Sequence, residues 1–424
     1  MNLKKTVAFS LLCILCNQGR MNAQKNFFNN DKVTTSFYAQ FWLRNTDMNP
    51  GTVINGEEVS RKTDLSIRRL RMSMGVDITD KLYAYMILGG NSYNTKNDKT
   101  FPFGILDLYT EYRASEYFQI GVGKSGFQGL SRWNIRSAST LMALDAPLFT
   151  LNTVNKNDDL GRSLGVWMKG QAAKFDYRLV LNQPFQVTKT SENGVDFATN
   201  NPKLKWSTYV KYMFLDSESN KSAYSAGSYL SAKKVLNLGG GYMAQKDAMQ
   251  NSVNGVAQEY YDMKHWAVDL YYNSPLRHGS DQSITTYFGY FSYDYGPDYI
   301  RNVAADNIAT SSTADASFNG SGDGFPMMGT GDTFFLQFGY AFPVKIDGKN
   351  RPVQPNIAIQ HSKWEKLDDP MIVYDLGVNL YLNGKKSKLT LGYQYRPIFY
   401  EGENGEITQE DYKGMTVLQY QIGF

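Results

Sequence analysis

Residues 415–424 read MTVLQYQIGF and decide the fold class, because they alternate between two kinds of side chain. Apolar or aromatic side chains lie at Leu418, Tyr420, Ile422 and Phe424, and two glutamines and a glycine lie between them. Successive side chains of a β-strand point to opposite faces. The segment therefore predicts a strand with one apolar and one wet face, as in a strand that separates lipid from water.

The same alternation recurs along the rest of the chain. No stretch of 18 apolar residues follows residue 23, so membrane-spanning helices are not expected. In lipid only a closed barrel leaves no strand edge unpaired. The sequence predicts an all-β protein, an antiparallel transmembrane β-barrel of sixteen strands. The strands are expected at about 33–44, 65–78, 81–91, 103–113, 117–124, 162–172, 175–182, 203–214, 235–246, 262–273, 283–294, 332–342, 353–362, 372–382, 388–397 and 415–424.

The connections between these segments alternate in length. Links after odd-numbered strands are mostly long, and links after even-numbered strands are mostly short, as at residues 79–80 and 173–174. Barrels of the bacterial outer membrane have long external loops and short periplasmic turns, so the pattern indicates that membrane. The third long link, 125–161, is among the longest. The stretch 215–234 departs from the pattern, because it is long where a short turn is expected.

The first 23 residues have the pattern of a secretory signal. Two lysines precede an apolar run over residues 6–16 that is too short to span a bilayer, and Ala23 is the expected cleavage point. We therefore expect a signal peptide over 1–23 and an outer-membrane β-barrel over 24–424. Both cysteines lie inside the signal, so neither a disulfide nor a Cys-ligated metal is expected in the exported part.

Composition narrows the function classes. Removal of the signal takes away three basic residues and no acid, which lowers the formal net charge from +4 to +1. This balance gives no reason to expect a nucleic-acid partner. No two of the three histidines have metal-ligand spacing, so neither a metal nor another cofactor is expected. A soluble β-sandwich is the alternative fold, but aromatics make up 14% of the chain and recur at strand ends, as in a membrane-interface girdle that includes Trp42.

Four stretches resemble the phosphate-selective porins O and P, a family of outer-membrane porins of Gram-negative bacteria. They are DLSIRRLRMSMGVDITDKLYAYM at 64–86, GVGKSGFQGLSRW at 121–133, FDYRLVLNQPF at 175–185 and VLQYQIGF at 417–424. The resemblance implies a sixteen-stranded barrel, a homotrimer, and a third external loop, here 125–161, that folds into the pore. It also implies a preference for phosphate and other anions.

Candidate pore-lining residues follow from the alternation and the loop. The basic candidates that would guide anions are Arg69, Arg71, Lys124, Arg132, Arg178, Lys203, Lys205 and Lys211. The acidic candidates on the same wet face are Asp107, Glu111 and Asp176. A pore lined by both signs selects weakly by charge, so only a weak anion preference is expected. Arg68 falls on the opposite face and is expected to snorkel along the lipid boundary.

These observations predict a porin, a water-filled diffusion pore for small hydrophilic solutes, and not an enzyme. The expected partners are outer-membrane lipid and lipopolysaccharide, further copies of the chain in a homotrimer, and the barrel assembly machinery, which would recognise Phe424. Two alternatives stay open. The first is a barrel enzyme of the phospholipase or protease type, for which His265 beside Asp269 is the best candidate. The second is a non-conducting surface receptor or adhesin.

Overall fold

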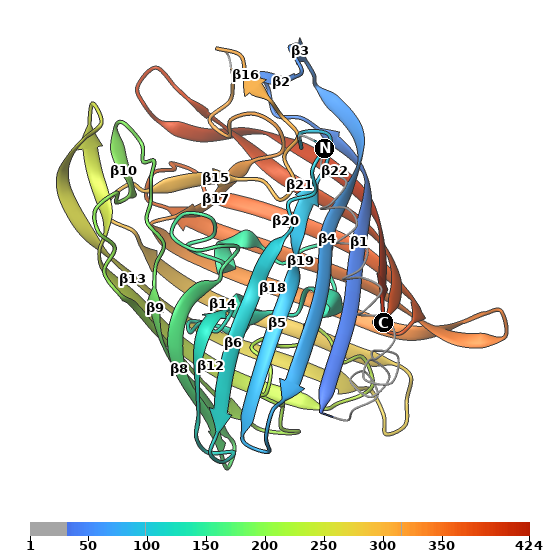
Figure 1. Cartoon of the computed structure of the whole chain (residues 1–424). Helices are drawn as coiled ribbons and strands as arrows, with labels where there is room; N and C mark the ends of the chain where they lie inside the picture. Colours follow the sequence, from blue (N-terminus) through green and yellow to red (C-terminus); the bar gives the residue numbers. More distant parts are fainter. Residues whose placement is uncertain (1–31, 98, 315) are drawn as a thin grey trace, which may run out of the picture.

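The computed structural model describes residues 32–97, 99–314 and 316–424, so the signal peptide expected over 1–23 lies outside the described residues. Sixteen antiparallel strands close into a barrel, because β1 pairs with β4 on one side and with β22 on the other (Figure 1). The predicted sixteen-stranded barrel is confirmed. The wall strands are β1 (Val33–Asp47), β4 (Arg61–Asp77), β5 (Leu82–Tyr93), β6 (Gly104–Arg113), β7 (Gln119–Ser125), β8 (Ser163–Ala172), β9 (Phe175–Gln183), β11 (Lys205–Met213), β12 (Val235–Val253), β13 (Val256–Pro275), β14 (Ser283–Asp294), β18 (Gly331–Ile346), β19 (Lys349–Trp364), β20 (Met371–Asn383), β21 (Ser387–Glu401) and β22 (Ile407–Gly423).

Shorter strands lie at one end of the barrel. They are β2 (Thr52–Ile54), β3 (Glu57–Glu58), β10 (Gly194–Phe197), β15 (Ile300–Val303), β16 (Ser311–Ser312) and β17 (Phe325–Gly329). The helices of the described residues are three short 3-10 turns, Arg132–Ile135, Ala138–Thr140 and Leu148–Thr150. No helix within these ranges is long and apolar enough to cross a membrane.

The outer face of the wall is apolar. Leu418 and Phe338, for example, are 45% and 42% exposed, whereas Gln419 and Gln337 beside them are buried inside. A closed barrel with a belt of exposed apolar side chains fits lipid, because the wall strands pair into a closed ring and the side chains of the belt are apolar. The same belt includes Leu108, Leu164, Val210, Leu270 and Leu376.

Two long hairpins replace expected loops. We expected a loop over 247–261, but β12 and β13 continue to a two-residue turn at Asn254 and Gly255, with φ of 50° and 76°. Asp347 and Gly348 form the corresponding turn between β18 and β19, with φ of 49° and 73°. Asn-Gly and Asp-Gly favour such turns because both residues tolerate positive φ. The alternation of apolar and polar side chains is weak in these extensions, so the strands predicted from the sequence end too early there.

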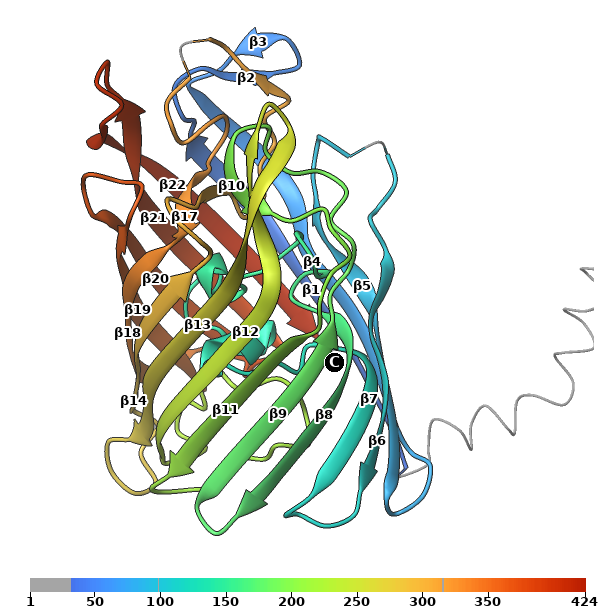
Figure 2. The ribbon, with the colours of Figure 1, turned by 90° about the vertical axis from the view of Figure 1, so that its left-hand side faces the viewer.

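Two connecting segments fill much of the barrel interior. Residues 126–162 follow β7 yet reach wall strands far around the barrel: the Arg132 backbone N–H donates to Asp269 of β13 at 2.6 Å, and Asn379 of β20 donates to the Met142 carbonyl at 2.8 Å. Residues 214–234 enter between β11 and β12, and the Ser137 N–H donates to the Ser225 carbonyl at 2.7 Å. The stretch 215–234, which the sequence showed to be too long for a short turn, is therefore a segment that packs on 126–162 (Figure 2).

Aromatic packing holds one side of the interior. Trp133 packs edge-on against Tyr287 with ring centroids 5.3 Å apart, and Phe149 packs edge-on against Phe291 at 5.0 Å. All four side chains are buried. Trp42, expected in the outer girdle, also points inward and donates to Gln419 at 2.8 Å. A cavity remains on the side near β1, β4 and β5.

Candidate functional site

A β-bulge turns two consecutive arginines into the barrel. Along β1, Gln40 pairs with Arg69 but the next residue, Phe41, pairs with Ile67, so Arg68 has no partner in the register. The extra residue of a bulge shifts the alternation by one position. Arg68 and Arg69 are consequently both buried inside, with 3% and 6% of their surface exposed. The expectation that Arg68 snorkels on the outer face is wrong for this reason.

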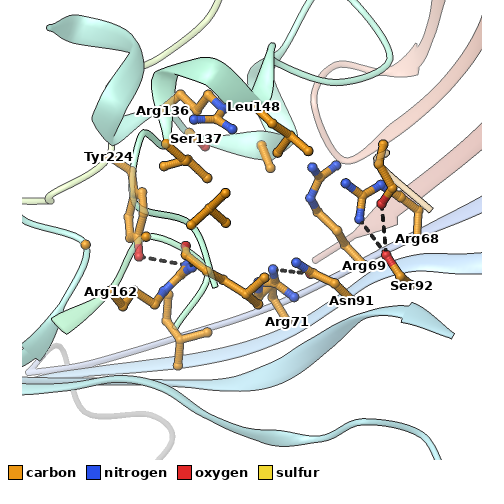
Figure 3. A pocket seen from close by; sticks show the side chains of 18 of the residues that line it. Arg68, Arg69, Arg71, Asn91, Ser92, Arg136, Ser137, Leu148, Arg162 and Tyr224 are labelled. Atoms are coloured by element: carbon orange, nitrogen blue, oxygen red, sulfur yellow. Dashed lines mark hydrogen bonds between the residues drawn. The ribbon is translucent and has the colours of Figure 1, made fainter. Parts of the chain in front are cut away.

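These arginines border a cavity of about 310 Å³ between the wall and the inserted segments. The wall side comes from β1, β4 and β5, and the opposite side comes from 126–162, Tyr224 and β15. Figure 3 shows Arg136 and Leu148 across the cavity from Arg69 and Arg71. No acidic side chain is among the described residues that line it. The lining has six arginines: Arg68, Arg69, Arg71, Arg136, Arg162 and Arg301.

Asp145 partly neutralises this cluster from behind the lining. Its two carboxylate oxygens accept from Arg68 at 2.6 Å and from Arg69 at 2.5 Å. Burial alone raises the pKa of Asp145. The charges of Arg69, Arg68 and Arg136 lower it by more, so the net pKa lies below its usual range. Asp145 therefore stays ionised and ties the loop 126–162 to β4.

Three of the arginines have no carboxylate partner within ion-pair distance among the described residues: Arg71, Arg136 and Arg301. Arg71 donates to the Gly90 carbonyl at 2.7 Å, and Arg301 donates to the Val154 carbonyl at 2.8 Å. Carbonyl dipoles orient a guanidinium without cancelling its charge. Uncompensated positive charge therefore remains at the cavity.

Arg136 shows how crowded these charges are. Burial lowers the pKa of Arg136 to about 10, and the nearby Arg69, Arg162 and Arg68 lower it as well, while Asp145 raises it. Its guanidinium donates to the Trp133 carbonyl at 3.0 Å. An anion in the cavity would relieve this repulsion, because an opposite charge favours the protonated form.

Arg162 is held by β6, the wall strand next to β5. It pairs with Asp107 of β6 at 3.2 Å and donates to the Tyr224 hydroxyl at 3.0 Å. Tyr224 in turn donates to Asp107 at 2.6 Å. Tyr224 belongs to 214–234, so this contact joins both inserted segments to the wall. One predicted acidic residue, Asp107, thus positions an arginine that the alternation did not reveal.

The predicted basic residues separate into three groups. Arg69 and Arg71 line the cavity. Four others point inward but bind the inserted segments: Arg132 and Lys211 pair with Glu218, Arg178 donates to the Ala223 carbonyl at 3.1 Å, and Lys205 donates to Thr153 at 3.0 Å. These four side chains anchor loops instead of lining open space.

Two predicted basic residues do not face the interior. Lys124 shares its register row with Leu108 and Leu164, which are exposed on the outer face, and its ammonium pairs with Asp159 of the loop. Lys203 is exposed and precedes the first residue of β11. Lys203 was predicted from the alternation, but it lies before β11, where the register no longer constrains the side chain. Lys124 was predicted from its place near the loop and not from the alternation.

The remaining acidic candidates point inward but lie outside the cavity lining. Glu111 pairs with Lys169 at 2.8 Å, and both side chains are fully buried. Asp176 accepts from Gln171 at 2.7 Å. Lys169 was missed in the sequence although it occupies an inward position of β8. Arg68, Arg136, Arg162 and Arg301 were also missed, since three of them lie outside the wall strands and the fourth sits at a bulge.

The candidate catalytic pair does not form. Asp269 accepts from Tyr209 at 2.8 Å, Tyr287 at 3.1 Å and the Arg132 backbone. His265 is fully buried between the rings of Tyr293 and Tyr295, and its Nδ1 accepts from the Asp294 N–H at 3.2 Å. Without a hydrogen bond between the histidine and the acid, this pair lacks the geometry of a general base.

Comparison with known proteins finds likeness in fold alone. No family model and no curated protein match the sequence. The anion-selective porin from Comamonas acidovorans matches with a TM-score of 0.51 and 13% identity, over 92% of this chain and 99% of that one. OmpF of Salmonella typhi, in complex with daunomycin, matches with a TM-score of 0.52 and 10% identity, over 93% and 99%. The chain is a β-barrel of the bacterial outer membrane with the porin fold.

Proposed function

We propose that this protein is a diffusion pore for small hydrophilic solutes and that it prefers anions. The observation that supports the proposal is the arginine-lined cavity of about 310 Å³, which has no acidic side chain among its described lining residues. The inserted segments 126–162 and 214–234 occupy much of the interior, and we propose that solutes pass on the side of β1, β4 and β5, where this cavity lies. We propose 126–162 as the constriction loop for the same reason.

The preference follows from electrostatics in a narrow passage. Guanidinium groups stay protonated at neutral pH and bind carboxylate or phosphate oxygens through parallel N–H groups. A ring of like charges raises the local concentration of counter-ions and excludes ions of the same sign. Phosphate is one anion that this chemistry would accept, and its preference over chloride stays a prediction.

Reversal potential tests the proposal directly. The purified full-length barrel would be inserted into a planar bilayer that separates two KCl concentrations. We expect stable conductance and a reversal potential of the sign set by chloride. A folded barrel that conducts no ions would contradict the pore, and a cation-selective pore would contradict the role of the arginines.

The expected partners are proposed on separate grounds. The exposed apolar belt supports contact with outer-membrane lipid and lipopolysaccharide. Trimerisation is proposed from the family resemblance, and chemical crosslinking in native membranes would test it: a ladder that ends at three copies is expected. Recognition of Phe424 by the assembly machinery is proposed from the alternating last strand, which in the structure pairs with β1.

A further inference from the structure

Part of the lining of the arginine-lined cavity is apolar. Across the space from the arginines of β4, the loop 126–162 and the β15 segment contribute hydrocarbon side chains beside Arg136, Arg162 and Arg301. Figure 3 shows Leu148 on the loop side, opposite Arg69 and Arg71. Leu148 and Leu151 keep part of their surface open, because each is only half-buried. The apolar lining on this side includes Leu148, Leu151, Val154, Leu160 and Val303.

A hydrated inorganic ion gains nothing from this apolar wall. Phosphate, sulfate and chloride hold their water strongly, and contact with hydrocarbon replaces that water without a hydrogen bond. An organic acid has both parts that the cavity can use. Its carboxylate can bind a guanidinium, and its hydrocarbon body can leave water against the leucines.

The charge of Arg71 lies on the side of the cavity opposite the leucines. Arg71 has no carboxylate partner among the described residues, and its guanidinium is fixed by the Gly90 carbonyl and the Asn91 amide oxygen at 2.7 and 2.5 Å. A cation that is oriented in advance binds an anion with less loss of conformational freedom. A volume of about 310 Å³ is at the lower end for small-molecule sites, which suits an acid of a few carbons or one aromatic ring.

We propose that the cavity is a binding subsite for small organic carboxylates with an apolar body, such as short fatty acids. This inference rests on the proposed pore and adds the substrate class. The carboxylate binds at Arg71, and the alkyl chain lies on Leu148 and Leu151. The subsite raises the local concentration of such acids at the narrowest part of the passage.

Chain length is the variable that separates this subsite from a simple anion filter. The chloride current through the full-length barrel would be measured while acetate, butanoate or hexanoate is added at equal concentration. Each buried methylene strengthens binding by up to about fourfold. We expect the inhibition constant to fall from acetate to hexanoate by at least about tenfold. Hexylammonium, of equal length and opposite charge, is expected not to inhibit.

Variants test the apolar part and the charged part of the site separately. Leu148→Asn and Leu151→Asn are expected to remove the dependence on chain length and to preserve chloride selectivity. Leu276→Asn is the matched control, because Leu276 is exposed in a turn outside the cavity. Leu148→Ala repeats the test with a milder change. Arg71→Gln is expected to weaken all three acids to a similar degree.

The outcomes distinguish this inference from the proposed function. A chloride-selective pore that binds acetate and hexanoate equally would overturn the subsite and leave the pore intact. Equal inhibition by hexylammonium would overturn the role of Arg71. A barrel without conductance, or with cation selectivity, would overturn the proposed function itself.

Discussion

Arg132 and Glu218 form a doubly hydrogen-bonded ion pair inside the barrel, with N–O distances of 2.6 and 2.7 Å. Arg132 belongs to the loop 126–162 and Glu218 to the segment 214–234, so the pair joins the two inserted segments. Lys211 of β11 also pairs with Glu218, at 3.0 Å. Removal of one partner from a buried pair is costly, because the remaining charge stays desolvated.

Glu218→Gln is expected to loosen both inserted segments. Two buried cations, Arg132 and Lys211, lose their counter-charge, which costs about 3 to 5 kcal/mol. Hydrogen exchange in residues 126–162 and 214–234 should accelerate, while exchange in the wall strands stays unchanged. Glu192→Gln is the control, since Glu192 is exposed. Unchanged exchange in both segments would show that aromatic packing alone holds them.

The pair of Arg132 and Glu218 also predicts the pH below which the two inserted segments lose their packing inside the barrel. Burial raises the pKa of Glu218, but Arg132 and Lys211 lower it more, so the net pKa is well below its usual value. A carboxyl group whose pKa is lower in the folded state than in the unfolded state stabilises the folded state at pH values above its unfolded-state pKa. This stabilisation is lost as the pH falls through the folded-state pKa. Protease resistance of both segments should persist at pH 5 and decline only in stronger acid. A decline between pH 7 and 5 would contradict this assignment.

Arg71→Gln is expected to lower the chloride-to-potassium permeability ratio. A unit charge about 6 Å from a permeating ion contributes about 0.7 kcal/mol at the dielectric constant of water, with opposite sign for chloride and potassium, so the ratio should change by about tenfold. Reversal potentials in a KCl gradient measure the ratio. Arg277→Gln is the control, because Arg277 is exposed in a short turn. If both variants behave alike, the selectivity arises elsewhere in the barrel.

Asp145→Asn is expected to change selectivity in the opposite direction. Arg68 and Arg69 lose their shared counter-charge, so the energies of chloride and potassium shift in opposite directions, and the chloride-to-potassium permeability ratio should rise by up to about tenfold on the same Coulomb estimate. Because the pKa of Asp145 is below its usual range, the selectivity of the unmodified protein should stay constant from pH 8 to pH 5. Asp347→Asn, in an exposed hairpin turn, is the control. A fall in chloride preference would indicate that Asp145 mainly holds the constriction loop in place.

Phe424→Ala is expected to weaken the seam of the barrel. The backbones of Phe37 and Phe424 exchange two hydrogen bonds at 2.9 and 3.0 Å, and their rings stack with centroids 5.0 Å apart. Loss of the ring contact should cost about 0.5 to 1.5 kcal/mol. Thermal unfolding followed by heat-modifiable gel migration would report it. Phe118→Ala, in an exposed turn, is the control, and an equal shift for both variants would exclude a special role of the seam.

The barrel could be predicted from the sequence because a wall strand in lipid repeats every two residues. Each predicted segment corresponds to one wall strand, and residues 415–424 indicated the lipid face that Leu418 and Phe338 show in the structure. This information is local: each strand records its own alternation of lipid and interior. The period of two is interrupted at strand extensions and at bulges, such as the one beside Arg68.

The cavity could not be predicted from the sequence, because it is formed by contacts between distant parts of the chain. Arg71 on β4, Arg136 in a loop and Arg301 on β15 meet because 126–162 folds inward, and no periodicity in a loop records where it will pack. The partners of Arg132 and Lys211 likewise come from a segment that looked like an overlong turn. Strand patterning is sufficient to predict the wall, whereas tertiary packing decides which inward charges are neutralised and which remain free to meet a solute.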